Sequence, residues 1–117
     1  MSINNATVCG NITRDAQGRK IADGYVINFT VAVNEPYKDG DEWKTKAAFI
    51  PCVMFGNRAE KLEQYLKKGI KICVSGSLKY SEWTKDDEKR SRVEILVRDL
   101  EFMARKDDNK DDYVPFD

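Results

Sequence analysis

Alternation of hydrophobic and polar residues is the dominant pattern along this chain, and it is typical of strands buried on one face. The clearest case spans residues 25–34, where apolar side chains take every second position and polar or small residues fill the gaps. A similar alternation over residues 6–13 predicts a first strand, and the almost wholly apolar run over residues 47–56 predicts a third. Pro51 indicates an irregularity in that third strand, because proline has no N–H to donate to a ladder.

One segment has helical rather than alternating periodicity. Asn57, followed three residues later by Glu60, matches a capping box, and apolar residues then recur at helical spacing until a Lys-Lys-Gly sequence ends the pattern. This predicts a helix over about residues 58–68. Two more strands are predicted over residues 70–79 and 92–103. The element order shows no sign of parallel crossovers.

The remaining stretches are rich in residues that favour turns and solvent. Residues 15–19 form a turn-rich segment, residues 35–46 mix proline, glycine and charge with two large aromatics, and residues 81–91 are polar and charged. We expect the last two to be exposed loops. Five short strands with one short α-helix between strands 3 and 4 predict an all-β fold, the five-stranded OB-fold barrel, in which loops and one sheet face form the ligand surface.

The distribution of charge along the chain matters more than the neutral total. The 117 residues suit one domain. Residues 1–106 hold 19 of the 20 Lys and Arg and 15 of the 20 Asp and Glu, a balance of +4, whereas residues 107–117 hold one Lys and five Asp, a balance of −4. We expect a barrel domain over residues 1–104 and a flexible acidic interaction tail over residues 105–117.

Several classes of function find no support in the composition. The chain has no histidine, and Cys9, Cys52 and Cys73 form no CxxC pair, so we expect no metal site and assign the three thiols to the core of a protein in a reducing compartment. No apolar run approaches the roughly 20 residues of a membrane span, and the first residues do not resemble a secretory leader. We therefore expect a cytoplasmic protein that makes no membrane contact, needs no cofactor and is not an enzyme.

Aromatic residues interleaved with lysines are the candidate chemistry. Proteins that bind single strands without reading sequence stack bases on flat side chains and place cations along the phosphate path. For Phe49 and Phe55 core packing is the competing interpretation, whereas Tyr37, Trp43 and Trp83 lie among polar residues that favour exposure. The candidate stacking residues are Tyr37, Trp43, Phe49, Phe55, Tyr80 and Trp83. The candidate phosphate contacts are Lys38, Lys44, Lys46, Arg58, Lys68, Lys71, Lys79 and Lys85.

These motifs together resemble the bacterial single-stranded DNA-binding protein family over nearly the whole chain. NATVCGNITRD is similar to the family's first strand, INFTVAVNE to its second, FIPCVMFGNRAEKLEQYLKKG to its third strand and helix, and GSLKYSEW to its fourth strand. The resemblance implies base stacking on Tyr37, Phe49, Phe55 and Trp83. It also implies a homotetramer, located at the nucleoid, that binds and protects single-stranded DNA without strong sequence preference in replication, recombination and repair.

The C-terminal residues carry a second resemblance. DDYVPFD is similar to the acidic tip with which the family docks into basic, apolar pockets of replication and repair proteins. The tail residues with this expected role are Asp111, Asp112, Tyr113, Val114, Pro115, Phe116 and Asp117. The chain departs from the family in its added last residue, its short linker, and Ser81, Glu82 and Pro51 at positions that are commonly basic, as in a divergent or mobile-element member.

The sequence leaves two other hypotheses for the function open. An adaptor barrel that binds chiefly proteins would share the fold, but the tip sequence Val-Pro-Phe argues against it. An enzyme on the same barrel, such as a nuclease, would need chemistry that the sequence does not offer, because there is no histidine, no convincing acidic metal cluster and no GxxxxGK loop.

Overall fold

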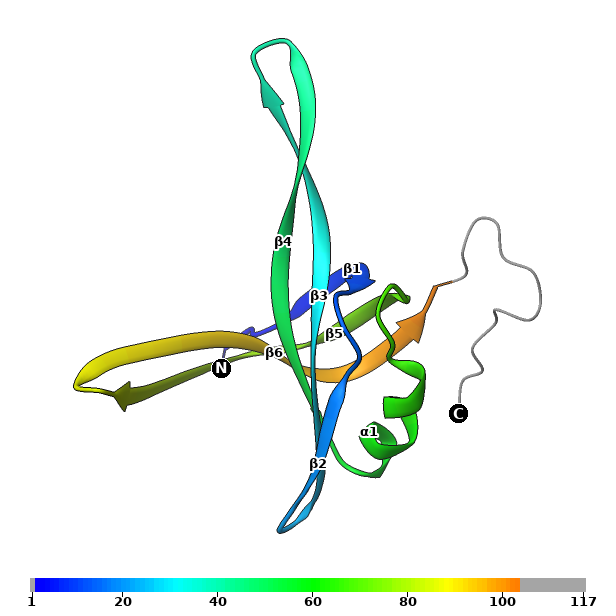
Figure 1. Cartoon of the computed structure of the whole chain (residues 1–117), viewed down its shortest axis with the longest axis vertical. Coiled ribbons are helices and arrows are strands. Elements are labelled where there is room, and N and C mark those ends of the chain that lie inside the picture. The colour runs from blue at the N-terminus through cyan, green and yellow to red at the C-terminus, as the bar shows by residue number, and fades with distance from the viewer. Residues whose placement is uncertain (1, 104–117) are drawn as a thin grey trace.

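The strands of the computed structural model, which describes residues 2–103, close into a barrel (Figure 1). The sheet order is β1-β5-β6-β4-β3-β2, and a further pairing of β1 with β3, through Asn11 opposite Ala32 and Ile12 opposite Val31, closes the ring. The elements are β1 (Ala6–Ile12), β2 (Gln17–Ile21), β3 (Gly24–Asp39), β4 (Glu42–Phe55), α1 (Asn57–Leu62), the 3-10 turn η1 (Glu63–Tyr65), β5 (Lys71–Lys85) and β6 (Glu88–Phe102).

This arrangement confirms the predicted five-stranded barrel with one short helix between its third and fourth strands. The ring consists of β1, β3, β4, β5 and β6, while β2 pairs with β3 outside it. The absence of parallel crossovers was a wrong expectation, because β4 and β6 pair in parallel through Cys52 opposite Ile95 and Val53 opposite Leu96. The helix and β5 lie between these strands in sequence and supply the length that a parallel return needs.

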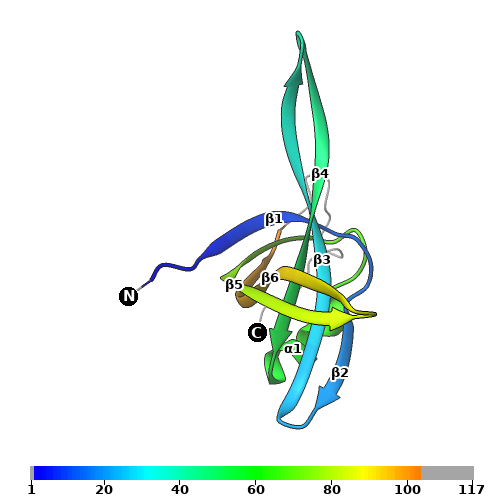
Figure 2. The same ribbon diagram turned by 90° about the vertical axis from the view of Figure 1, so that its left-hand side faces the viewer.

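The two segments predicted as exposed loops are instead hairpin arms that extend the barrel strands. Residues 35–46, the β3–β4 arm, stay paired out to Asp39 opposite Glu42, and residues 79–94, the β5–β6 arm, stay paired out to Lys85 opposite Glu88. The two arms project in different directions, as Figures 1 and 2 show. The loop prediction was wrong because an arm exposed on both faces needs no apolar alternation, while its backbone groups still pair across the hairpin.

Local details at the helix and at β2 also differ from the sequence prediction. The helix predicted over residues 58–68 ends at Leu62 and tightens into the 3-10 turn η1, and residues 17–21 of the turn-rich region form β2. The N-cap residue is Gly56, with no side-chain cap hydrogen bond, so the predicted capping box by Asn57 is wrong. The φ of Gly56 is 103°, a backbone conformation that glycine adopts without strain.

The core fills the inside of the barrel and the end that the helix covers. Strand positions that point inward are fully buried, among them Ile27, Ile72 and Ile95, and Leu66 after η1 seals the end beside α1. Glu63 ties the β2–β3 hairpin to this end by accepting hydrogen bonds from the Tyr25 hydroxyl and from the backbone N–H of Gly18, the latter at 3.0 Å. The helix end of the barrel is thus held by both apolar packing and a shared carboxylate.

Close strand crossings in the barrel depend on two glycines. A Cβ atom at Gly10 would meet the carbonyl oxygen of Ala32, and one at Gly76 would meet that of Leu96. Gly76 also lies at a register shift next to Ser75 in the β5–β6 ladder. Both positions let neighbouring backbones approach more closely than any side chain would allow.

The cysteine assignment is only partly correct. Cys52 is 1% exposed in the core as expected, but Cys9 is exposed and Cys73 is half-buried on the outer side of the sheet. An apolar segment does not by itself say which of its residues face inward; in β1 the alternation turns Val8 and Ile12 toward the core and Cys9 away from it. In the part of the chain that the structure describes, α1 is six residues long and no helix has the length and apolarity to cross a bilayer.

Candidate nucleic-acid interface

The side chains of two phenylalanines of β4 are exposed to solvent on the outside of the barrel. Phe49 is 64% exposed and Phe55 is 45% exposed. Ile50, Cys52 and Met54 take the inward positions of the same strand, and the period of two then turns the odd-numbered residues outward. The competing interpretation of core packing is therefore wrong for both rings.

Residues of β5 continue this outer face on the far side of β6, the strand that lies between β4 and β5. Trp83 is 43% exposed, and Lys79 lies on the same side of β5 because the two are an even number of residues apart. The Lys79 Nζ is 5.6 Å from the centroid of the Phe55 ring, a cation–π contact that joins the two strands. We call Phe49, Phe55, Lys79 and Trp83 the aromatic face.

Arginines of β6 border the aromatic face and were missed from the sequence. Arg90 lies directly opposite Trp83, and Arg92 lies directly opposite Ser81. Both carry ion pairs within β6, Arg90 with Glu88 at 3.6 Å and Arg92 with Glu94 at 3.5 Å. Arg90 was missed because residues 81–91 were interpreted as a loop; the spacing of two between the arginines was the signal that could have identified both.

A polar hollow of about 110 Å³ lies beside Arg92, between the β1–β2 connection and the outer side of β3. Guanidinium, amide and hydroxyl groups in one hollow can donate hydrogen bonds to phosphate oxygens or to base edges. Its lining residues are Arg14, Asp15, Gln17, Asn28, Phe29, Thr30 and Arg92. None of these had been singled out from the sequence, since they come from three separate segments of the chain.

The β3–β4 arm presents one aromatic residue on each of its two faces. Trp43, 71% exposed near the tip, lies opposite Lys38. Tyr37 lies opposite Lys44 on the other face, with the Lys46 Nζ 5.8 Å from the centroid of its ring. Lys44 also pairs with Asp39 at 2.9 Å near the end of the arm. Stacking candidates expected to act together are thus divided by the alternation of the strands.

Most of the other candidate residues lie away from the aromatic face. Tyr80, opposite Val93, is on the other side of the β5–β6 arm from Trp83, and Arg58 donates from Nη1 to the carbonyl of Arg98 at 3.0 Å. Lys71 begins β5, about 40 Å along the strand from Trp83 at 3.3 Å per residue. Lys68 precedes it, with its backbone N–H donating to Asp15. Lys85, at the tip of the β5–β6 arm, is on the Trp83 side.

The fold and this face define a class of protein. A closed barrel with open rings beside lysine and arginine on one outer surface has the features of OB-fold proteins that bind single-stranded nucleic acid. The family model described as the single-strand binding protein family matches residues 3–103. The chain belongs to this family.

Similar proteins and structures agree with the assignment. The single-stranded DNA-binding protein of Borreliella burgdorferi is 40% identical over 87% of this chain, and that of Treponema pallidum is 34% identical over 87%; the chain spans 70% and 58% of their lengths. A Plasmodium falciparum SSB complex with ssDNA superposes with a TM-score of 0.82 at 25% identity, covering 89% of this chain and 97% of the other. A small single-stranded DNA-binding protein from Streptomyces coelicolor shares the fold with a TM-score of 0.72 at 21% identity, covering 88% and 96%.

Residues 104–117 lie outside the described part of the chain. The predicted boundary of the barrel domain at residue 104 and the predicted roles of Asp111 to Asp117 therefore stay predictions. Within residues 2–103 there is no group of three or more Cys, Asp or Glu side chains placed to hold a metal ion.

Proposed function

We propose that this chain binds single-stranded DNA without strong sequence preference, using the aromatic face as its stacking platform. The observation that carries the proposal is that Phe49, Phe55 and Trp83 are open to solvent on one outer surface, with Lys79 beside them. Large apolar side chains exposed together mark binding surfaces in soluble proteins. The names of the relatives and the DNA in the Plasmodium complex support single-stranded DNA as the ligand.

The magnitudes favour stacking over long-range attraction. Each stacked base contributes about 1–3 kcal/mol, so three rings contribute about 3–9 kcal/mol before the cost of ordering the strand. The described part of the chain carries only a small positive balance, and Arg90 and Arg92 are partly neutralised by Glu88 and Glu94. Affinity should therefore fall only modestly with salt, with a slope of about −0.7 for each phosphate contact.

Titration of the intrinsic tryptophan fluorescence with oligo-dT tests this proposal. Stacking of bases on Trp83 is expected to quench its emission, and the variant Trp43→Phe isolates that signal from the arm tryptophan. Duplex DNA of the same length is the matched control, because its bases are not free to stack on the rings. Equal quenching by duplex and by oligo-dT, or no quenching by either, would contradict the proposal.

The same proposal extends to a role in replication, recombination and repair, with partner proteins recruited through residues 111–117. Support comes from the sequence of this segment, in which Pro115 and Phe116 supply an apolar anchor and the aspartates supply charge for basic partners. The homotetramer implied by the family resemblance belongs to the proposal and is checked by the molar mass in solution.

Affinity capture from the source cells tests the recruiting role. The immobilised full chain is expected to retain replication or repair proteins that a variant carrying Pro115→Ala and Phe116→Ala does not retain. Both proteins keep the three acidic residues of the segment, so a difference reports the apolar anchor and not the charge. If the variant retained the same proteins as the natural chain, Pro115 and Phe116 would not be the anchor that recruits partners.

A further inference from the structure

The polar hollow beside Arg92 adjoins the aromatic face. Arg92 lies two residues from Arg90, the cross-strand partner of Trp83, and therefore shares the outer side of the β5–β6 arm with that ring. On β3, Thr30 lies opposite Pro51, whose odd-numbered position in β4 faces outward as the two exposed phenylalanines do. A DNA strand stacked on these rings therefore has the hollow beside its backbone.

Four polar side chains of the hollow are available to a ligand. Within residues 2–103 these side chains make no hydrogen bond or ion pair, so a ligand can bind them without breaking a contact of the fold. Guanidinium, amide and hydroxyl groups all carry hydrogen-bond donors, and donors from several segments can converge on one oxygen-rich group. The four residues are Arg14, Gln17, Asn28 and Thr30.

The carboxylate of the hollow has its charge balanced by the segment after η1. Asp15 accepts a hydrogen bond from the backbone N–H of Lys68 at 2.9 Å, and its other oxygen is 3.8 Å from the Lys67 Nζ. Arg14 is next to Asp15 in the chain but has no acidic partner among the described residues. The positive charge of Arg14 is therefore available to an anion from outside the chain.

Arg92 is held by a partner that an anion need not displace. Its Nη2 is 3.5 Å from the Oε2 of Glu94, whose side chain is only 12% exposed, whereas the Arg92 side chain is 49% exposed. A guanidinium has further N–H donors, and their planar fork matches the oxygens of a phosphate. Arg14 and Arg92 thus bring two positive charges from separate segments to one hollow of about 110 Å³.

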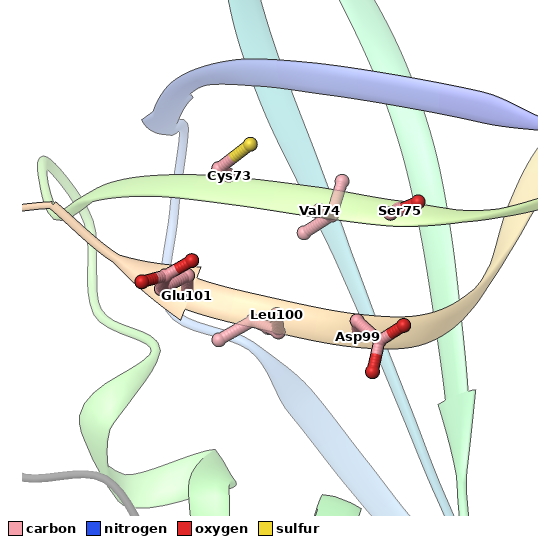
Figure 3. A pocket seen from close by; sticks show the side chains of 6 residues that line it. All are labelled: Cys73, Val74, Ser75, Asp99, Leu100 and Glu101. Carbon is pink, nitrogen blue, oxygen red and sulfur yellow. The ribbon is translucent and has the colours of Figure 1, made fainter.

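A second hollow, also of about 110 Å³, has the opposite charge (Figure 3). It lies along β5 and β6, and its lining includes the carboxylates of Asp99 and Glu101 but no lysine or arginine. Such a lining repels a phosphate group, because like charges at close range are unfavourable. The two hollows have the same volume, so the side chains that line them, and not their size, make the hollow beside Arg92 the one that suits an anion.

We propose that the polar hollow binds one phosphate group of the DNA strand, with Arg14 and Arg92 as its cationic contacts. This inference rests on the proposed function, because the phosphate arrives as part of a strand whose bases stack on the aromatic face. Asn28 and Thr30 add neutral polar groups from β3. An internal phosphodiester and a terminal phosphate offer the same kind of oxygen atoms to the arginines.

The test measures how the oligo-dT affinity of the full chain depends on salt, in the natural chain and in a variant carrying Arg14→Gln and Arg92→Gln. Loss of one phosphate contact should make the slope of log affinity against log salt shallower by about 0.7 and weaken binding roughly tenfold at low salt. The single variant Arg14→Gln breaks no contact among the described residues, so its share of the loss cannot come from misfolding.

A matched control removes two positive charges elsewhere on the surface. Lys20→Gln and Lys61→Gln, in exposed side chains of β2 and α1, should leave the slope unchanged. An equal change of slope in this control would overturn the phosphate site, because the loss of any two charges would then be sufficient.

The oligonucleotide ends distinguish the two sources of phosphate. If the arginine substitutions weaken binding of oligo-dT with and without a terminal phosphate, the ligand is an internal phosphodiester; if they weaken only the phosphorylated form, the ligand is the terminal group. Natural slope and affinity in the double arginine variant would overturn the phosphate site while leaving the stacking platform intact. Failure of the natural chain itself to bind oligo-dT would refute the proposed function and this site together.

Discussion

Replacing Phe55 and Trp83 together by alanine is expected to weaken oligo-dT binding by roughly 30-fold to 10,000-fold. Each ring stacks on a base for about 1–3 kcal/mol, and a factor of ten in affinity corresponds to about 1.4 kcal/mol. The two rings are on neighbouring parts of the aromatic face, where the Lys79 ammonium contacts the Phe55 ring at 5.6 Å. Dissociation constants for a fluorescein-labelled oligo-dT at fixed salt, measured by anisotropy, provide the comparison.

The other side of the same arm supplies the matched control. Tyr80 and Val93 are an exposed cross-strand pair that faces away from Trp83. Their joint replacement by alanine removes similar apolar surface but should change affinity by no more than a few-fold. Binding by the Phe55→Ala, Trp83→Ala double variant within threefold of the natural chain would refute the stacking role. An equal loss in the control would mean that the platform is on the other side of the arm.

Truncation of Leu66 to alanine is expected to lower the free energy of unfolding by about 2–5 kcal/mol. Leu66 is fully buried where the segment after η1 closes the barrel, so removing its side chain leaves a cavity. Its carbonyl accepts a hydrogen bond from the Ala16 N–H at 2.8 Å, a backbone contact that the substitution leaves in place. The loss should therefore reflect packing alone.

Leu78→Ala is the control for this stability measurement. It deletes the same atoms from a side chain that is 48% exposed, so it should cost less than about 1 kcal/mol. Urea denaturation of both variants and the natural chain gives the comparison, with an unchanged dependence on urea concentration as the sign that the unfolding reaction is the same. Equal losses at the two positions would show that Leu66 does not close the core.

Local pattern was sufficient for the barrel strands and the location of the helix. The alternation over residues 25–34 falls within β3, and the apolar run over residues 47–56 corresponds to the barrel part of β4. These segments each have one face in the core, and burial of that face is what produces a readable period. The arms have no buried face, and their sequences therefore resemble loops although their backbones are paired.

The kinds of side chain on the binding surface were also apparent from the sequence. Which of these side chains lie together on one side of the barrel was not. Exposed aromatics beside lysines identified Phe49, Phe55 and Trp83 as candidates, and the structure places them on one outer side of the barrel. Tyr80 was grouped with Trp83 from proximity in sequence, yet the two point to opposite sides of β5. Arg92 was overlooked because the residues it joins in the polar hollow are distant along the chain.

For this protein the order of amino acids determined the fold class, the helix position and the kinds of side chain available for binding, because each depends on interactions between residues near one another in the chain. Which side each strand presents outward, and which distant residues meet there, depended on long-range pairing such as Cys9 with Cys73 and Trp83 with Arg90. A shift of one residue in that pairing would turn every side chain of a strand to the other face. Register is set only when the barrel closes, so this information belongs to the tertiary structure.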